Sequence, residues 1–461
     1  MALIKSISGI RGTIGGKVGE NLTPIDVVQF VSAFITFLKK DENPLTIVVG
    51  RDARVSGEMI NKLVCSTLQS LGVNVIDLGL STTPTVEMAV VHHHSDGGII
   101  LTASHNPMQW NALKLLNARG EFISAADGQK VLEIIEKQEY QFAEIDKLGK
   151  YSTYDKAIED HIEAILKLDL VNVDAIKRAH FSVILDCVNS TGGLALPLLL
   201  KKLGVLKVKV LNDDCSGVFA HNPEPLPQNL RGIADAMKKG SYSVGFVVDP
   251  DVDRLAILTE NGDMFGEEYT LVSVADYVLQ HKKGNTVSNL SSTRALRDVS
   301  RKHSVDYNAS AVGEVNVVEK MKETDAVIGG EGNGGVIFPE LHYGRDALVG
   351  IALFLTYMAE TGMKCSEIRR LYPSYVISKN KIDLRADMDL KAILQHIAKK
   401  YAKNEVNTID GVKIDFENGW VHLRPSNTEP IIRIYAEAEN GKMADSMAEK
   451  IIADIREFLH S

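Results

Sequence analysis

The sequence predicts three related α/β domains of mixed sheet and a C-terminal α+β domain, arranged around a central cleft. Short apolar runs alternate with segments of helical periodicity, and this alternation returns three times along the chain. The last stretch of about 90 residues follows a different pattern. A chain of 461 residues is also too long for one hydrophobic core. We therefore expect four domains, with the boundaries 1–150, 151–256, 257–371 and 372–461.

The first domain opens the alternation of strands and helices. The β-branched run Thr46–Gly50 predicts a strand, and Ser56-Gly-Glu58 predicts the start of a helix whose apolar residues recur at helical spacing. Residues 73–78 and 98–102 predict two more strands. Polar or glycine-rich segments follow the strands, and parallel α/β sheets bind their ligands at these carboxyl ends. The loops are therefore the expected site of the chemistry.

The second and third domains repeat this order. The second round comprises a strand at 181–186, a helix at 194–203, and strands at 208–211 and 244–249. The third round comprises a strand at 285–289, a helix at 293–301 and a strand at 325–329. Repetition of one pattern along a chain is typical of related structural units.

The final domain differs because it pairs two helices with adjacent strands. Residues 392–401 and 443–458 predict the helices, and residues 420–424 and 431–438 predict two strands joined by a turn. It begins near Tyr372-Pro373, because a proline breaks the preceding helix. We expect this domain to act as a lid or clamp.

Composition limits the partners and the compartment. A formal net charge of −9 argues against nucleic acid as a partner and favours a small molecule. The sequence has neither a signal peptide nor a run of about 18 apolar residues, so we expect a cytoplasmic protein without membrane association. The four cysteines lie far apart in sequence, which predicts neither a zinc site nor a disulfide framework. The sequence predicts no particular oligomeric state.

The first candidate loop is Thr102-Ala-Ser104-His105-Asn106-Pro107. A serine among polar side chains, with a proline that fixes the backbone, can be presented as a nucleophile or as a phosphate carrier. The alternative is an ordinary turn, because serine, asparagine and proline are common turn residues. Arg11 and Lys114 would add positive charge near this loop, although either could be a surface cation.

The second candidate loop is Asp249-Pro-Asp251-Val-Asp253-Arg254, directly after an apolar strand. Three carboxylates at alternate positions of an extended chain converge on one side, which suits a hard divalent cation. Without a cation, the three charges would repel one another and raise their own pKa values. The alternatives are a calcium loop of the EF-hand kind, which lacks its glutamate here, and a solvated acidic turn.

Two further loops carry residues suited to a sugar phosphate. In Gly329-Gly-Glu331-Gly-Asn333-Gly-Gly335, a carboxylate and an amide can contact vicinal hydroxyls, whereas the alternative is a flexible turn. In Arg424-Pro-Ser426-Asn427-Thr428-Glu429-Pro430, followed by Arg433, guanidinium, hydroxyl and amide donors form a candidate phosphate clamp. The alternative for these arginines is solvation at the surface. His92-His93-His94 resembles a metal-binding tract, but we expect it to end a helix instead.

Taken together, the four loops resemble the α-D-phosphohexomutase family, in that family's order and across nearly the whole chain. The resemblance implies that Ser104 carries the phosphoryl group, and that Asp249, Asp251 and Asp253 bind Mg²⁺ with one phosphoserine oxygen. It also implies that Glu331 and Asn333 contact the sugar. The implied phosphate ligands are Arg424, Ser426, Asn427, Thr428 and Arg433. Arg11 and Lys114 match positions that the family places near the reacting oxygen, and Arg254 would assist beside the metal. Lys114 and His105 are the two candidates for the general base, whereas Arg11 would act electrostatically.

The implied activity is interconversion of a hexose 6-phosphate and a hexose 1-phosphate through a sugar 1,6-bisphosphate, which would also serve as the activator. The sequence departs from the family pattern at Asn333, where many members have serine, and at Gly335, where many have histidine. The segment Val312-Gly-Glu314-Val departs as well. The pattern is most similar to members that act on glucosamine phosphate, with glucose or mannose phosphate as the alternative. A phosphatase that uses the aspartate loop and a non-catalytic sugar-phosphate sensor are the rival functions.

Overall fold

The computed structural model describes residues 3–6, 9–40, 43–383, 389–425 and 431–460. The chain forms two compact units. The first unit consists of residues 1–277 and 333–368, and the second of residues 278–332 and 369–461. None of the described helices combines the length and the apolar character that a bilayer crossing requires.

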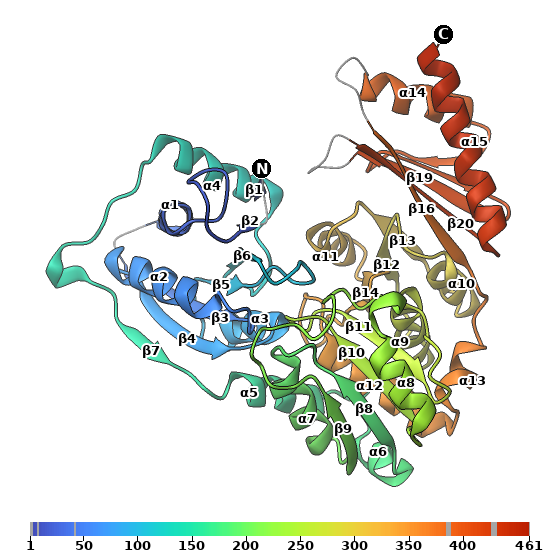
Figure 1. Cartoon of the computed structure of the whole chain (residues 1–461), viewed down its shortest axis with the longest axis horizontal. Helices are drawn as coiled ribbons and strands as arrows, with labels where there is room; N and C mark the ends of the chain where they lie inside the picture. Colours follow the sequence, from blue (N-terminus) through green and yellow to red (C-terminus); the bar gives the residue numbers. More distant parts are fainter. Residues whose placement is uncertain (1–2, 7–8, 41–42, 384–388, 426–430, 461) are drawn as a thin grey trace. The chain divides into compact units, whose positions relative to one another are not determined.

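A seven-stranded mixed sheet dominates the beginning of the first unit. Its strands are β1 (Leu3–Ser6), β2 (Gly9–Thr13), β3 (Thr46–Arg51), β4 (Asn74–Leu80), β5 (Gly97–Leu101), β6 (Trp110–Asn117) and β7 (Tyr151–Thr153). They lie in the order β1-β2-β6-β5-β3-β4-β7 (Figure 1). β3 pairs in parallel with β4 and β5, whereas β6 runs antiparallel to β5 and β2. The carboxyl ends of β3 and β5 therefore lie at one edge of the sheet.

Helices cover both faces of this sheet because its central strands are apolar on both sides. The helices are α1 (Pro24–Leu38), α2 (Gly57–Ser70), α3 (Thr83–His92) and α4 (Ala125–Lys137). Ile47 and Val49 of β3 share a buried cluster with α1, α2 and α4. Val48, between them, packs with α3 on the opposite face. This alternation is the period of two that a strand imposes on its side chains. α3 ends at His92, as the histidine tract predicts.

A smaller mixed sheet follows in the same unit. Its strands are β8 (Ser182–Asp186), β9 (Lys207–Leu211), β10 (Val244–Val248) and β11 (Leu255–Thr259), in the order β11-β10-β8-β9. β8 is parallel to β9 and β10, and β11 is antiparallel to β10. The helices that accompany this sheet are α5 (Ala157–Leu166), α6 (Val173–Ala179), α7 (Gly192–Lys202), η2 (Pro227–Asn229), α8 (Arg231–Lys239) and α12 (Ala347–Thr361). The unit also contains η1 (Ile145–Lys147), which precedes β7, and the short strand β15 (Gly335–Ile337). α9 (Glu267–His281) and α13 (Cys365–Arg369) run across the sequence boundaries of the two units.

The second unit begins with a parallel arrangement of three strands. β12 (Thr286–Asn289) pairs with β13 (Tyr307–Ser310) and β14 (Ile328–Glu331), and α10 (Ala295–Lys302) and α11 (Glu314–Glu323) connect them. The expectation of a strand at 325–329 is wrong by a few residues. Asp325 has a φ of +48°, so the chain still turns there after α11 and becomes extended only at Ile328.

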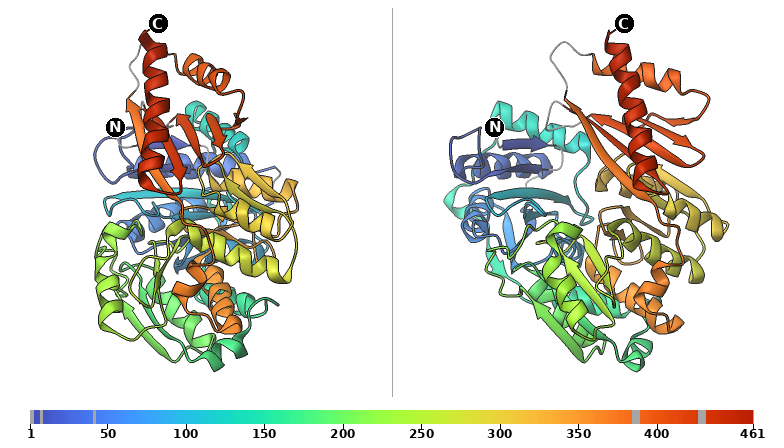
Figure 2. Two further views of the ribbon diagram at one scale, coloured as in Figure 1. Left: turned by 90° about the vertical axis from the view of Figure 1, so that its right-hand side faces the viewer. Right: turned by 45° about the vertical axis from the view of Figure 1, so that its right-hand side comes forward.

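An antiparallel five-stranded sheet completes the second unit. Its strands are β16 (Val376–Asp383), β17 (Glu405–Asn407), β18 (Val412–Phe416), β19 (Gly419–Pro425) and β20 (Ile431–Ala438), in the order β16-β20-β19-β18-β17. α14 (Leu390–Lys400) and α15 (Gly441–His460) share one hydrophobic core with the sheet, and α15 lies along it (Figure 2). The sequence analysis predicted two of these five strands. β16 and β17 are rich in polar residues, whereas β18 (Val-Lys-Ile-Asp-Phe) alternates apolar and polar residues, a strand signal that the prediction missed.

The predicted fold class is confirmed in each of its parts: mixed α/β sheets come first and an antiparallel α+β sheet comes last. The exact domain boundaries and the central cleft stay predictions.

Candidate active site

Two of the predicted loops meet inside the first unit. Ser104 follows β5, and Asp249 follows β10. The Ser104 hydroxyl donates a hydrogen bond of 2.8 Å to Asp249 Oδ2. Both side chains are buried. The serine and the acidic loop, 145 residues apart in sequence, therefore form one site.

The serine loop has a tightly defined backbone. Ser104 has a φ of +48°, in the left-handed region that a side chain with a Cβ rarely occupies. Its backbone N–H donates to Thr102 Oγ1 at 2.9 Å, and the Thr102 hydroxyl donates to Asp52 Oδ2 at 2.6 Å. Surrounding contacts must hold such a conformation against its cost of about 1–3 kcal/mol.

The main holding group is Arg54, which the sequence pattern did not reveal. Its side chain is buried and pairs with Asp52 at 3.0 Å. Its guanidinium donates to four backbone carbonyls of the serine loop: those of Ser104, Asn106 (2.7 Å), Pro107 (2.8 Å) and Trp110 (2.9 Å). No local sequence signal identifies this role, because the carbonyls belong to residues that follow a different strand.

The acidic loop is a turn, so the expectation of an extended chain is wrong. β10 ends at Val248, and Val252 has a φ of +64°. The turn brings one ligand atom from each of Asp249, Asp251 and Asp253 within 4.8 Å of the others. All three carboxylates have an exposed fraction of 0%. The alternative of a solvated acidic turn is therefore wrong too.

Protein donors engage some of the carboxylate oxygens and leave others available. Asp251 Oδ2 accepts from Lys114 Nζ at 2.8 Å, and Asp253 Oδ2 accepts from Arg345 Nη2 at 2.6 Å. Asp251 Oδ1 and Asp253 Oδ1 are buried and have no hydrogen-bond partner among the described residues. A buried acceptor without a partner costs about 1–3 kcal/mol. Oxygen ligands with available lone pairs are what Mg²⁺ requires, so this donor set fits the ion.

Burial and neighbouring charges shift the pKa values of the acidic loop and of Lys114. Burial, together with the nearby Asp253 and Asp251 carboxylates, raises the pKa of Asp249 well above its ordinary value. Burial alone would raise the pKa of Asp251, but the Lys114 ammonium outweighs it and lowers that pKa. Burial likewise opposes the charge of Lys114, yet Asp251 and Asp253 raise the pKa of Lys114. Lys114 is therefore a firmly held cation beside the acidic loop.

The other predicted helpers lie around the serine. The imidazole Nδ1 of His105 is 3.4 Å from Ser104 Oγ. Burial, with Arg254 and Arg11 nearby, lowers the pKa of His105 to about 2, so its ring is neutral. Arg11 donates to Asn106 Oδ1 at 2.9 Å. The backbone N–H of Arg254 donates to Asp249 Oδ1 at 3.1 Å.

Asn333 belongs to the first unit and folds back on its own loop. Its Oδ1 accepts from the Gly335 N–H at 3.2 Å. Gly334 has a φ of +88°, and a Cβ there would lie 2.4 Å from the Leu255 carbonyl oxygen. The glycine therefore lets this loop pass close to β11 beside the acidic loop.

Glu331 and Arg424, from two other predicted loops, are connected inside the second unit. Glu331 Oε1 accepts from Asn289 Nδ2 at 2.9 Å and from the Gly313 N–H at 3.3 Å. Asp410 Oδ2 accepts from the Val312 N–H at 3.0 Å and lies 3.6 Å from Arg424 Nη1. The segment that contains Val312 and Gly313 therefore links the predicted sugar and phosphate residues.

Three cations form a row across the C-terminal sheet. Arg424 of β19 lies directly opposite Arg433 of β20, which in turn lies opposite Lys381 of β16. Like charges directly opposite one another destabilise a sheet, and a bound anion would relieve that cost. Lys381 had no sequence signal as a member of this group. The predicted residues Ser426, Asn427 and Thr428 lie outside the described part of the chain.

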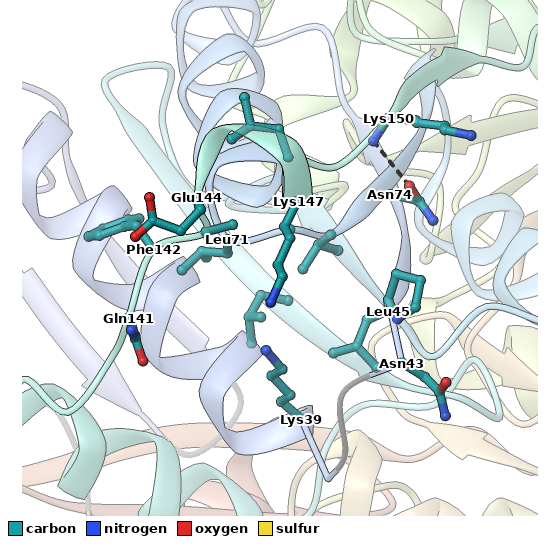
Figure 3. A pocket seen from close by; sticks show the side chains of 16 residues that line it. Lys39, Asn43, Leu45, Leu71, Asn74, Gln141, Phe142, Glu144, Lys147 and Lys150 are labelled. Atoms are coloured by element: carbon teal, nitrogen blue, oxygen red, sulfur yellow. Dashed lines mark hydrogen bonds between the residues drawn. The ribbon is translucent and has the colours of Figure 1, made fainter.

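A cavity of about 740 Å³ in the first unit lies away from this chemistry (Figure 3). Leu45, Leu71 and Asn74 line it, so it opens at the amino ends of β3 and β4. Lys39 and Lys147 point toward one another there, but both are exposed and can turn into solvent. No predicted site residue lines this cavity.

Almost the whole chain is similar to known protein families. Family models described as phosphoglucomutase/phosphomannomutase match in four consecutive segments. Their α/β/α domains I, II and III match residues 4–142, 159–262 and 266–375, and their C-terminal domain matches residues 381–454.

Individual relatives agree with the family models. A phosphoglucomutase/phosphomannomutase of Thermococcus kodakarensis is 37% identical over 456 residues, covering 97% of this chain and 98% of the relative. A probable phosphoglucosamine mutase of Pyrococcus abyssi is 32% identical and covers 97% of both chains. The crystal structure of a phosphoglucomutase/phosphomannomutase family protein from Burkholderia thailandensis matches with a TM-score of 0.84 at 26% identity, covering 98% of this chain and 96% of the other.

Proposed function

Because the chain belongs to the phosphoglucomutase/phosphomannomutase family, and is thus a mutase of the isomerase class, we propose that it interconverts glucosamine 6-phosphate and glucosamine 1-phosphate. Ser104 is the phosphoryl carrier in this proposal. The observation that carries it is the 2.8 Å hydrogen bond from Ser104 Oγ to Asp249, inside a buried group of three carboxylates.

Mg²⁺ is the proposed cofactor, held by Asp249, Asp251, Asp253 and an oxygen on Ser104. The two buried Oδ1 atoms without hydrogen bonds support this assignment. When bound, a divalent cation neutralises charge on the phosphoryl group during transfer. Three carboxylates at 0% exposure would otherwise repel one another, which also favours a cation at this position.

The chain's own cations have separate roles in the proposal. Lys114 keeps its proton because Asp251 and Asp253 raise its pKa, so it acts as an electrostatic partner of the phosphoryl group. Arg11 and Arg254 add charge that does not depend on pH. His105 is neutral and lies 3.4 Å from Ser104 Oγ, where it can hydrogen-bond the serine oxygen.

The transfer conserves atoms and charge in two matched steps. First, the free hydroxyl oxygen of the sugar monophosphate attacks the phosphorus of phosphoserine 104. The bond from phosphorus to Ser104 Oγ breaks, and the hydroxyl proton ends on Ser104. The product is a sugar 1,6-bisphosphate. The bisphosphate then turns end over end, and its other phosphoryl group returns to Ser104 by the reverse chemistry.

Binding of the sugar and of its resident phosphate is assigned to other loops. Glu331 and Asn333 are the proposed sugar ligands, because a carboxylate and an amide can bind equivalent hydroxyls in both orientations. Arg424 and Arg433 are proposed to bind the phosphate that is not transferred, with Ser426, Asn427 and Thr428 as further ligands. The row of cations that includes Lys381 supports an anion at this sheet.

The preference for an amino sugar rests on charge and on similarity. Glu331 is nearly buried, and a buried carboxylate gains more from a substrate ammonium than from a hydroxyl. Relatives at 32% and 31% identity are named as a probable phosphoglucosamine mutase and a phosphoglucosamine/phosphogalactosamine mutase. The relative at 37% identity is named phosphoglucomutase/phosphomannomutase, which favours glucose or mannose phosphate as the second candidate.

Phosphorus NMR tests the proposal directly. Purified protein with Mg²⁺ and a trace of sugar 1,6-bisphosphate is given glucosamine 6-phosphate, glucose 6-phosphate or mannose 6-phosphate. We expect a 1-phosphate signal that forms fastest from glucosamine 6-phosphate. Replacement of the carrier by Ser104→Ala should reduce turnover by at least about a thousandfold, because covalent transfer has no other carrier.

The outcomes separate the rival functions. Release of inorganic phosphate by the Ser104→Ala protein would identify a phosphatase that uses the aspartate loop. Binding of a hexose phosphate without turnover would identify a sensor. Fast conversion of glucose or mannose phosphate, with slow conversion of glucosamine phosphate, would keep the mutase and change its substrate.

A further inference from the structure

We propose that Thr83 and Arg345 are positioning residues for the metal site, each of which binds one oxygen of a carboxylate and turns the other toward the cation. This inference rests on the proposed function, because it takes the acidic loop to be the site of a divalent cation. Neither residue belongs to any of the four loops that the sequence pattern singled out.

Thr83 fixes Asp251 through two contacts. The Thr83 hydroxyl donates to Asp251 Oδ2 at 2.7 Å, and the Thr83 backbone N–H donates to the Asp251 carbonyl at 2.9 Å. Both side chains are buried. A backbone bond and a side-chain bond between the same two residues set the position and the rotation of the carboxylate together.

Arg345 fixes Asp253 in the corresponding way. Its Nη2 donates to Asp253 Oδ2 at 2.6 Å, and the arginine side chain is only 9% exposed. The arginine stem passes over Gly335, where a Cβ would lie 2.4 Å from Arg345 Cδ. Gly335 therefore leaves the space that the arginine occupies. This is one of the positions at which the sequence departs from the family pattern.

In both Asp251 and Asp253, one carboxylate oxygen accepts hydrogen bonds and the other is available to a metal ion. Thr83 and Arg345 both engage Oδ2 atoms, and Lys114 shares Asp251 Oδ2 with Thr83, whereas Asp251 Oδ1 and Asp253 Oδ1 have no hydrogen-bond partner among the described residues. Rotation of an aspartate carboxylate about its Cβ–Cγ bond exchanges the positions of Oδ1 and Oδ2. Donors that hold one oxygen therefore decide which oxygen meets the metal, as outer-shell partners do in other metal sites.

A buried polar cluster holds the two positioning residues in place. It consists of Glu87, His161, His342 and Asp346. Asp346 follows Arg345 and caps α12, and Glu87 lies on α3, which begins at Thr83. His161 Nε2 is 2.9 Å from Asp346 Oδ2, and its Nδ1 is 3.0 Å from the Thr85 hydroxyl.

His342 connects the same elements a second time. Its Nε2 is 3.4 Å from Asp346 Oδ2, and its Nδ1 is 3.2 Å from Glu87 Oε2. The cluster thereby ties the start of α3 to the start of α12, and so ties Thr83 to Arg345. If His161 donates from Nε2 to Asp346, it accepts from the Thr85 hydroxyl at Nδ1, so both ring nitrogens of His161 have a protein partner.

The test measures metal affinity directly, with Mn²⁺ as the probe and electron paramagnetic resonance of free Mn²⁺ as the readout. Thr83→Val keeps the shape of the side chain and removes the donor, whereas Thr83→Ser restores the donor. We expect Thr83→Val to weaken Mn²⁺ binding by about 10- to 100-fold, and Thr83→Ser to recover most of the affinity. Arg345→Met and Gly335→Ala should weaken binding alike, because both remove the arginine from Asp253.

Thr67→Val is the matched control. Thr67 is also a buried threonine of the first unit, but its hydroxyl donates to the Leu63 carbonyl within α2. This control should leave Mn²⁺ affinity unchanged. If Thr83→Val and Arg345→Met bind Mn²⁺ as tightly as the unsubstituted protein does, the two residues are not positioning residues, although the acidic loop would remain the proposed metal site. No Mn²⁺ binding by the unsubstituted protein would instead overturn the proposed function.

A second outcome addresses the buried cluster. One equivalent of tightly bound metal that is lost in His342→Gln and retained in Asp249→Asn would show that the cluster is itself a metal site. That result would overturn its assignment as a purely hydrogen-bonded connection. We expect both unsubstituted protein and His342→Gln to bind the same number of metal equivalents.

Discussion

At the scale of single residues, the candidate site depends on side chains that organise others. Arg54 donates to four carbonyls around Ser104 and pairs with Asp52, although it does not contact the serine side chain in any bond described. Ser104 itself needs this support because its φ is +48°. Ser104 could be predicted as the phosphoryl carrier from its neighbours in sequence. The residue that holds it could not be predicted in this way, because its partners come from another strand.

Replacement of this arginine should damage the carrier loop. Arg54→Met leaves Asp52 as a buried charge without its cation, so the free energy of unfolding should fall by about 3–5 kcal/mol. Turnover should fall as well, because Ser104 would lose its fixed direction. Denaturant titration and phosphorus NMR measure the two effects.

Arg54→Lys separates charge from geometry in the same experiment. A lysine keeps the positive charge but cannot reach four carbonyls with one ammonium, so turnover should stay low while part of the stability returns. Arg119→Met, at an exposed arginine paired with Glu121, is the control and should change neither quantity. Normal turnover in Arg54→Lys would show that the guanidinium geometry is dispensable.

At the scale of elements, the ends of helices and strands determine which groups meet. α3 starts with Thr82 as its N-cap, and α12 starts with Asp346 as its N-cap, which accepts from the Leu348 and Val349 N–H groups. The Thr82 hydroxyl also shares a hydrogen bond with the Thr85 hydroxyl, and Asp346 Oδ2 is 2.9 Å from His161 Nε2, so both caps belong to the network that ties α3 to α12. Each capping residue therefore has two roles, and the second is invisible in the local sequence.

The buried histidine between these helices gives a pH-dependent stability. Burial opposes the charge of His342, but Asp346 and Glu87 outweigh it and raise its pKa from 6.5 to about 10. His161 is the other titratable side chain of the cluster that faces it. A raised folded-state pKa stabilises the protein fully below pH 6.5 and progressively loses that contribution as the pH rises toward 10.

We therefore expect His342→Gln to be less stable than the unsubstituted protein at pH 6, and the gap to narrow as the pH approaches 10. Urea titrations at about pH 6, 8 and 10 measure the two free energies of unfolding. Groups that titrate alike in both proteins do not contribute to the difference between the two free energies of unfolding. A gap that stays constant across this range would mean that His342 is neutral in the folded protein.

At the scale of the whole molecule, the proposed metal ligands are confined to one compact unit. Asp249, Asp251 and Asp253 all belong to the first unit, together with Ser104, Lys114 and Arg345. Of the proposed sugar and phosphate residues, Glu331, Arg424 and Arg433 belong to the second unit, whereas Asn333 belongs to the first. An effect of Mg²⁺ on unfolding is therefore expected in the first unit.

Mg²⁺ should stabilise the first unit in particular. A ligand that binds only the folded state adds about 2.7 kcal/mol at a concentration of 100 times its Kd. In calorimetry, Mg²⁺ should raise the unfolding temperature of the first unit, and a chelator should reverse the shift. Asp249→Asn relieves the repulsion among the carboxylates, so this variant should lose the Mg²⁺ effect without becoming less stable in chelator. An equal Mg²⁺ shift in Asp249→Asn would place the ion elsewhere.

The sequence by itself determined the fold class and the family, and it predicted the four candidate loops, because all of these depend on local patterns. Strand periodicity, glycine-rich turns and the residues around Ser104 and Asp249 can each be recognised within a few neighbouring positions. Polar strands such as β16 escaped recognition, because they are strands only through their pairing with β20.

The tertiary structure alone decided which residues support the loops. It brought Arg54 to the serine, Thr83 to Asp251 and Arg345 to Asp253, over sequence separations of 50, 168 and 92 residues. It also turned the acidic loop back on itself, where an extended chain was expected. Contacts over such distances arise from the packing of strands and helices, and no local spacing in the sequence encodes them.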